Sequence, residues 1–136
     1  MNTTLDQKTG QFSTEHPQKT PDSEKLTRHI TEGLLEKKGR EVKVLNVSEL
    51  TTLTDYFVVC HGTSDTQIRA LANSVIDTVK KSTGENPWQM EGMDSRNWII
   101  IDYVNVVVHI FNEEKRDFYG IERMWNDAAV TDVSEN

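Results

Sequence analysis

The chain has 136 residues and a formal net charge of -7, with 22 acidic against 15 basic residues. This length allows one domain, and the acidic balance argues against direct binding of nucleic acid, because neutralising phosphates requires clustered Lys and Arg. No stretch is long enough for a membrane span, and the N-terminus lacks the basic and apolar regions of a secretory signal, so we expect a cytoplasmic protein without a membrane partner.

The two ends of the chain are polar. Residues 1–21 hold only Leu5 and Phe12 as large apolar side chains, too few to offset the entropy of ordering the backbone, and we expect a disordered N-terminal tail. Residues 128–136 are similarly polar, and we expect a flexible C-terminal tail there. The folded domain is therefore predicted over residues 22–127.

The folded part is predicted to open with an amphipathic helix. Residues 20–24 combine an N-cap residue, a proline and acidic side chains, as at the start of many helices. Apolar residues then recur every four positions from Leu26 to Leu34, and Gly39 ends the pattern. The valines of residues 42–47 follow in a short strand pattern, so a helix followed closely by a strand is expected.

A second strand and a second helix are predicted next. Residues 56–61 form a nearly unbroken apolar run, typical of a central strand that is buried on both faces, and parallel pairing is possible there. Cys60 lies in this run, so we expect a small buried side chain rather than a zinc ligand or a disulfide partner. In the turn that follows, Ser64 and Gln67 have the spacing of a capping box, and apolar positions over residues 68–79 mark one face of a helix.

The most informative segment is a predicted β-hairpin with strands at residues 98–103 and 106–111. If Val104 and Asn105 are the central turn residues, the cross-strand partners follow from the geometry of a two-residue turn. These partners are Trp98 with Phe111, Ile100 with His109, Asp102 with Val107, and Tyr103 with Val106. The better core face carries Ile99, Ile101, Val108 and Ile110. The opposite face mixes an indole, a carboxylate and an imidazole with apolar groups, as the centre of a protein interface does.

The last predicted element is a short packed helix over residues 117–127, where Phe118, Ile121 and Trp125 have helical spacing. Before the hairpin, Pro87 marks a linker. Strands and helices that follow one another in this order indicate an α/β fold. We expect a single compact domain in which helices flank a mixed β-sheet.

Five segments, in this order and spacing, resemble the ribosomal silencing factor family, also called Iojap-like proteins, over residues 24–128. The segments are DYFVVCHGTS from Asp55, Glu91-Gly92, Trp98 followed by IIIDY, VVVHIF from Val106, and FYGIERMWNDA from Phe118. The resemblance implies a domain similar in topology to nucleotidyltransferases that binds the fourteenth protein of the large ribosomal subunit. That protein lies on the face that meets the small subunit, so the bound factor would block subunit joining and repress translation under nutrient limitation or in stationary phase. A role in large-subunit biogenesis is the alternative.

The chain departs from the family at one position of the hairpin. Where the family usually has glycine after the pair Asp102-Tyr103, this chain has Val104. Glycine suits the positive φ of a two-residue turn, and a β-branched residue is strongly disfavoured there. We therefore expect a different or longer turn.

The hairpin supplies most of the candidate partner-binding residues, and the implied mechanism is steric. Trp98 is the expected buried aromatic anchor, Asp102 is expected to accept a charge-assisted hydrogen bond from a basic partner, and Tyr103 to add amphipathic contact area. The full expected set is Glu91, Trp98, Asp102, Tyr103, Asn105 and His109. The alternative is that Trp98 and Phe111 pack beneath a helix, with His109 hydrogen-bonded to Asp102 or to the backbone. For His109 we favour this alternative.

Two other classes of function compete with this interpretation. The turn Gly62-Thr63-Ser64 is similar to the glycine-serine turn of nucleotidyltransferases, but those enzymes hold magnesium with two acids separated by one residue. No Asp-x-Asp or Asp-x-Glu follows Gly62, so we expect no enzyme, no catalytic residue, no metal and no cofactor. A homodimeric adaptor is the other alternative, because long apolar strands at a sheet edge can pair with a second copy of the chain.

Overall fold

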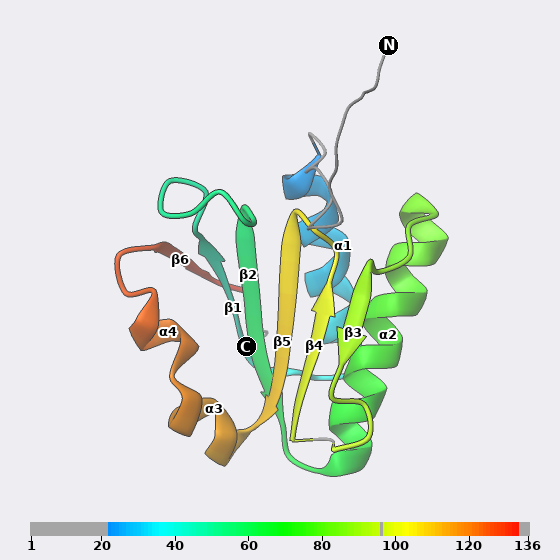
Figure 1. The fold of residues 1–136 in the computed structure, drawn as a ribbon. Helices are drawn as coiled ribbons and strands as arrows, with labels where there is room; N and C mark the ends of the chain where they lie inside the picture. The colour runs from blue at the N-terminus through cyan, green and yellow to red at the C-terminus, as the bar shows by residue number, and fades with distance from the viewer. Residues whose placement is uncertain (1–21, 96, 134–136) are drawn as a thin grey trace.

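The computed structural model describes residues 22–95 and 97–133, which form a six-stranded mixed sheet with helices on both faces (Figure 1). The sheet order is β3-β4-β5-β2-β1-β6. The strands are β1 (Arg40–Asn46), β2 (Tyr56–Gly62), β3 (Gln89–Glu91), β4 (Trp98–Asp102), β5 (Val106–Asn112) and β6 (Ala129–Asp132). The helices are α1 (Ser23–Glu36), α2 (Asp65–Thr83), α3 (Glu113–Tyr119) and α4 (Ile121–Met124), and none of these has the length and apolar character to cross a membrane. This arrangement confirms the predicted α/β fold.

The centre of the sheet is the parallel pair β2–β5, in which Val58 lies opposite Val108. The other neighbouring strands are antiparallel. Strand β2 is buried from Val58 to Gly62, as is typical of a strand that has helices on both faces. Burial raises the pKa of the Cys60 thiol to about 12, so this side chain packs as a small apolar group. The predicted buried central strand is therefore confirmed.

Helices α1 and α2 cover one face of the sheet and pack closely against each other (Figure 1). A Cβ atom at Gly33 of α1 would lie 3.0 Å from the carbonyl oxygen of Ser74 in α2, and the Ser74 hydroxyl donates a 2.7 Å hydrogen bond to the Gly33 carbonyl oxygen. The main core beneath these helices includes Leu26, Ile30, Leu34, Ile68, Leu71, Val75, Ile99, Ile101, Val108 and Ile110. The hairpin face predicted as the better core is therefore the face that α1 and α2 cover.

The start of α2 is held by Ser64 and Gln67, but not by a complete capping box. The Ser64 hydroxyl accepts from the Gln67 N–H at 3.1 Å, as predicted. The Gln67 side chain turns away from Ser64, and its Oε1 accepts from the Thr63 N–H at 2.7 Å. Its Nε2 donates to the carbonyl oxygens of Lys37 and Lys38, each at 3.1 Å. Gln67 thus joins the turn before α2 to the turn after α1.

Three segments differ from the predicted elements. The expected linker before the hairpin contains β3, which pairs with β4. The helix expected over residues 117–127 is two helices, because Gly120 between them takes a left-handed conformation with φ of 61°. The tail expected over residues 128–136 contains β6, an edge strand that pairs with β1 and has only exposed side chains, so it lacks the apolar alternation of a half-buried strand. The tail expected over residues 1–21 lies outside the described residues.

Candidate partner-binding surface

The predicted hairpin register is correct. In the structure Trp98 lies opposite Phe111, Ile100 opposite His109, and Asp102 opposite Val107. The Tyr103 N–H donates to the carbonyl oxygen of Val106 at 2.9 Å, which leaves two central turn residues. Of the two expected alternatives, a longer turn is therefore wrong, and the turn differs in its type instead.

Val104 itself takes the positive φ that would suit glycine. Its φ is 77°, and the Asn105 N–H donates to the Tyr103 carbonyl oxygen at 2.9 Å, which makes a γ-turn centred on Val104. A β-branched residue in such a conformation costs on the order of 1–3 kcal/mol. Asp102 Oδ1 offsets part of this cost by accepting from the Val104 N–H at 2.7 Å. The Asn105 carbonyl oxygen accepts from the Asp55 N–H at 2.9 Å, which ties the turn to the start of β2.

The face of the sheet opposite α1 and α2 is only partly covered. Figure 1 shows α3 and α4 beside β1 and β2, so that none of the four described helices lies over this face of β3 and β4. The uncovered part carries Glu91, Trp98, Ile100, Asp102 and Val107. We refer to these five residues, together with Tyr119 of α3, as the open-face surface. Glu91 and Tyr119 are exposed, and the other four are half-buried.

Aromatic rings support the open-face surface from beneath. Trp98 stacks on Phe111 with ring centroids 5.0 Å apart, and it meets Tyr119 of α3 at 4.3 Å. Phe57 of β2 lies with its ring centroid 5.3 Å from that of His109. Aromatic pairs at such separations stabilise a protein by about 0.5–1.5 kcal/mol beyond the burial of their area. These rings therefore hold α3 and the strands in a fixed relation at the open-face surface.

His109 is buried beneath Trp98 and is neutral. Its side chain is 6% exposed, and the Trp98 Nε1–H donates to its Nδ1 at 3.1 Å. Burial lowers the pKa of His109 from 6.5 to about 4, because the charged ring would lose its hydration. The alternative of a buried, hydrogen-bonded histidine thus describes this residue, with Trp98 as the partner of Nδ1 where Asp102 or the backbone was expected.

The structure brings Glu91, Trp98 and Asp102 to the open-face surface, but besides His109 it buries two further predicted residues. Tyr103 is 4% exposed and packs in the core beneath the helices, because alternation along the strand turns it to the face opposite Asp102. Burial raises the pKa of Tyr103, and its hydroxyl has no hydrogen-bond partner among the described residues. Asn105 is 1% exposed in the turn. The expectation that Tyr103 and Asn105 are available for contact is wrong.

The expected partner-binding set leaves out three residues of the open-face surface. Ile100 and Val107 lie on the predicted face of the hairpin, and the alternation that placed them there is the signal that identifies them. Tyr119 is 42% exposed and packs against Trp98. Its place depends on how α3 folds back on the sheet, and no local pattern reveals this.

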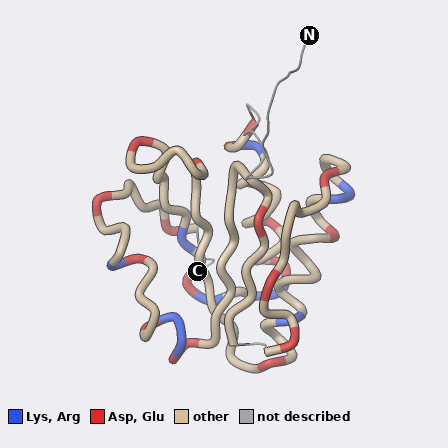
Figure 2. Tube along the Cα trace, viewed as in Figure 1, with Lys and Arg blue, Asp and Glu red and all other residues tan. Residues whose placement is uncertain are grey.

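Charge around the open-face surface is acidic. Strands β3, β4 and β5 contain no Lys or Arg, whereas Glu91 and Asp102 contribute acids to β3 and β4. Figure 2 shows acidic segments along β3 and the neighbouring turns and no basic segment on these three strands. The surface is therefore apolar at its centre and acidic at its edge, which suits a basic partner.

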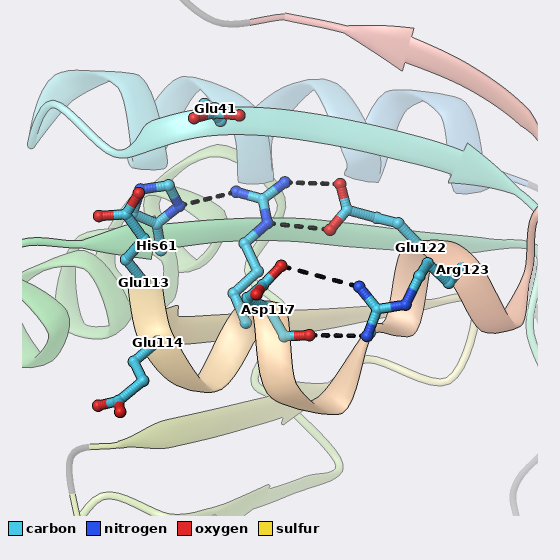
Figure 3. Close-up of a pocket in the computed structure, with 9 residues that line it drawn as sticks. Glu41, His61, Glu113, Glu114, Asp117, Glu122 and Arg123 are labelled. Carbon is cyan, nitrogen blue, oxygen red and sulfur yellow. Dashed lines mark hydrogen bonds and ion pairs between the residues drawn. The ribbon is translucent and has the colours of Figure 1, made fainter.

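A second group of polar side chains surrounds Arg116 of α3 (Figure 3). Arg116 is 7% exposed, and its Nε and Nη2 donate to the two carboxylate oxygens of Glu122 at 3.0 and 2.9 Å. Its Nη1 lies 3.0 Å from Nδ1 of His61 and donates to the Arg40 carbonyl oxygen at 3.3 Å. The hydrogen bonds from Arg116 lower the pKa of Glu122. Arg116 thus anchors α3 and α4 to β1 and β2.

The pocket beside Arg116 is lined mainly by acids, among them Glu41 of β1 and Glu113 and Glu114 of α3 (Figure 3). Within residues 22–95 and 97–133, no group of three or more His, Cys, Asp or Glu side chains is arranged to hold a metal ion. Sequence reasoning missed Arg116, because its partners lie 6, 55 and 76 positions away in the chain. We assign this cluster a structural role.

Comparisons with known proteins agree with one another. A family model described as ribosomal silencing factor during starvation matches residues 20–136. Ribosomal silencing factor RsfS of Bacillus subtilis is 34% identical over 98 residues, which is 72% of this chain and 82% of that protein. Mitochondrial assembly of ribosomal large subunit protein 1 of Mus musculus is 29% identical over 101 residues, 73% of this chain and 44% of that protein. A crystal structure from Chromobacterium violaceum is similar to this fold, with a TM-score of 0.75 and 30% identity, covering 85% of this chain and 95% of that one.

Proposed function

The chain belongs to the ribosomal silencing factor family, and from this membership we propose that it binds the large ribosomal subunit and represses translation in the cytoplasm. The partner on the subunit is its fourteenth protein, on the face that meets the small subunit. The bound protein blocks subunit joining when nutrients are limiting or in stationary phase. The mechanism is steric, so it requires neither a catalytic residue nor a cofactor.

The apolar centre of the open-face surface is the observation that carries this proposal. Trp98, Ile100 and Val107 are half-buried on a sheet face that the described helices cover only in part, and Tyr119 of α3 is exposed beside Trp98. A few aromatic anchors near the centre of an interface carry most of its binding energy. Because the Trp98 ring is already stacked on Phe111, binding immobilises little additional side chain.

The charge of the chain supports a basic protein partner. The net charge is -7, and the strands of the open-face surface carry acids without Lys or Arg. Opposite charges on two proteins speed their encounter and suppress unsuitable partners, and salt weakens the effect. A basic protein on the large subunit has the charge that complements this surface.

The test is sedimentation of the protein with purified large subunits, followed by addition of small subunits and measurement of the joined particles. We expect co-sedimentation and fewer joined particles. Ile100→Glu places a charge in the apolar centre and should abolish both effects. Val130→Glu is the matched control, because Val130 is 52% exposed in β6 at the opposite edge of the same sheet.

Each result has a definite meaning. Wild-type protein that does not sediment with large subunits would overturn the proposed function. A folded Ile100→Glu variant that binds as tightly as the wild type would place the binding surface elsewhere. Equal losses in the Ile100→Glu and Val130→Glu variants would show that added charge, rather than the surface, decides binding.

Assembly of the large subunit is the second candidate function, and the name of the mouse relative supports it. Cells without the gene would then accumulate incomplete large subunits, which sucrose gradients detect. If the protein is a silencing factor instead, starved cells without the gene should contain complete large subunits and more joined particles than starved wild-type cells. Light scattering of the free protein, before and after adding large subunits, tests whether a homodimer exists and whether the subunit displaces it.

A further inference from the structure

Trp98 directs its one polar atom into the protein. Its Nε1–H donates to Nδ1 of His109 at 3.1 Å, and His109 is 6% exposed. In the strand register Trp98 lies opposite Phe111, so His109 is its diagonal neighbour on β5. The His109 ring centroid lies 5.3 Å from that of Phe57 and 6.2 Å from that of Phe111. His109 is therefore a polar group set among aromatic rings.

We propose that His109 is a positioning residue whose Nδ1 holds the Trp98 indole in the orientation in which the ring meets the binding partner. This inference rests on the proposed function, because it concerns how the same surface binds. His109 acts through Trp98, since its own side chain is covered. With the indole N–H engaged inside the protein, the Trp98 ring offers its apolar surface to the partner.

The chemistry of the pair requires a neutral histidine in one tautomer. Nδ1 accepts a hydrogen bond only when the ring proton is on Nε2, and burial keeps the pKa of His109 near 4, so the ring is uncharged at neutral pH. Nε2 is buried and has no hydrogen-bond partner within the described part of the chain. The fold therefore leaves one donor unpartnered while providing an acceptor for the indole.

This arrangement is unfavourable for a residue whose only role is packing. An apolar side chain would fill a site among aromatic rings without leaving a buried Nε2–H unsatisfied, and replacing both partners of a buried hydrogen bond by apolar groups is often nearly neutral or stabilising. It would also leave the indole N–H without its acceptor, so the Trp98 ring would turn to find water. A role in positioning therefore predicts that stability and binding respond differently to the same substitution.

The test compares His109→Leu with His109→Asn, each made in the wild-type chain and in the Trp98→Phe variant. The amide oxygen of asparagine can replace Nδ1 as an acceptor, whereas leucine has none. In the free protein, NMR reports the Trp98 indole N–H resonance and its exchange with water. The resonance is assigned by its loss in Trp98→Phe. Sedimentation with purified large subunits gives the dissociation constant, and urea unfolding verifies that each variant folds.

We expect His109→Leu to keep near wild-type stability, to move the indole resonance toward that of a solvent-exposed tryptophan, and to weaken binding about tenfold. His109→Asn should restore both the resonance and the binding. In the Trp98→Phe background, which has no indole N–H, the leucine and asparagine variants should bind equally.

Three results would overturn the inference. They are wild-type resonance and affinity in His109→Leu, failure of His109→Asn to restore either, and unequal binding of the two variants in the Trp98→Phe background. Failure of the wild-type protein to bind large subunits would instead overturn the proposed function. The indole resonance of the free protein would still decide whether His109 holds Trp98.

Discussion

The carboxylate of Asp102 holds the backbone of Val104, accepting its N–H at 2.7 Å. This hydrogen bond joins residues two positions apart and stabilises the β-branched Val104 at a φ of 77°. An acid that the sequence suggests as a partner contact therefore also maintains the turn of its own hairpin. Experiments on Asp102 must separate these two roles.

Asp102→Ala should lower the free energy of unfolding by about 1–2 kcal/mol, because the Val104 N–H loses its acceptor. Asp102→Asn keeps an acceptor oxygen and should cost clearly less. Urea unfolding followed by circular dichroism measures both. If the two variants lose equal stability, the charge of Asp102 and not its hydrogen bond stabilises the turn.

Trp98→Ala should weaken binding to large subunits by at least about 2 kcal/mol, because it removes the aromatic centre of the open-face surface. Sedimentation at several concentrations of subunits measures the affinity, and circular dichroism verifies the fold. Trp88→Ala is the control, since Trp88 is 46% exposed and precedes β3, outside the surface. Unchanged affinity in a folded Trp98→Ala protein would exclude Trp98 from the interface.

Stability should fall as the pH is lowered from about 6.5 to about 4. Burial lowers the pKa of His109 to about 4, so in this range the unfolded chain takes up a proton that the folded chain does not. Protonation therefore favours unfolding, and the loss reaches about 3 kcal/mol at the lower limit. Above pH 6.5 the His109 ring is neutral in both the folded and the unfolded chain, so it no longer changes the free energy of unfolding as the pH rises.

Two further groups respond to acid. The pKa of His61 is lowered, mainly by burial and also by Arg116. Like His109, it therefore lowers the free energy of unfolding as the pH falls. The pKa of Glu122 is lowered by its hydrogen bonds from Arg116, so its contribution is lost only as the pH falls below 4.5. Urea unfolding of wild type and His109→Asn across this range isolates the His109 contribution. A stability difference that does not change with pH would contradict the prediction.

Gly92 and Gly84 both have positive φ, 90° and 79°, but differ in their surroundings. A Cβ atom at Gly92 would collide with the carbonyl oxygen of Trp98, whereas a Cβ atom at Gly84 would meet nothing within 4 Å. Gly84→Ala should therefore cost about 1 kcal/mol, the price of the backbone conformation alone. Gly92→Ala should cost clearly more, because β4 must shift. Thermal unfolding compares the two variants, and equal costs would show that crowding at Gly92 is relieved easily.

The sequence predicts those parts of the site that depend on local geometry. The hairpin register follows from strand alternation and a two-residue turn. The structure confirms it for the strand pairs from Trp98–Phe111 to Asp102–Val107. The rule that a β-branched residue disfavours positive φ led us to expect a different or longer turn at Val104, and the structure has a γ-turn without added length. Hydrogen bonds from outside the turn, such as that from Asp55, stabilise the conformation.

The rest of the site depends on contacts between distant segments. Tyr103 and Asn105 stand beside the candidate residues in the sequence, yet the fold buries both. Tyr119 and Arg116 gain their roles only when α3 packs on strands far away in the chain. No pattern of neighbouring residues encodes these positions, so the face of the sheet was predictable and its full set of exposed side chains was not.

The parallel pairing at the centre of the sheet also sets an order for folding. Val58 and Val108 lie side by side although they are 50 positions apart in the chain, whereas three residues join β4 to β5. Closing a long loop costs more entropy than closing a short one, so we expect the hairpin to form early and the β2–β5 pairing late. Residues 98–119 carry most of the open-face surface. They can thus begin to pack against one another before β2 joins β5 and completes the sheet that supports them.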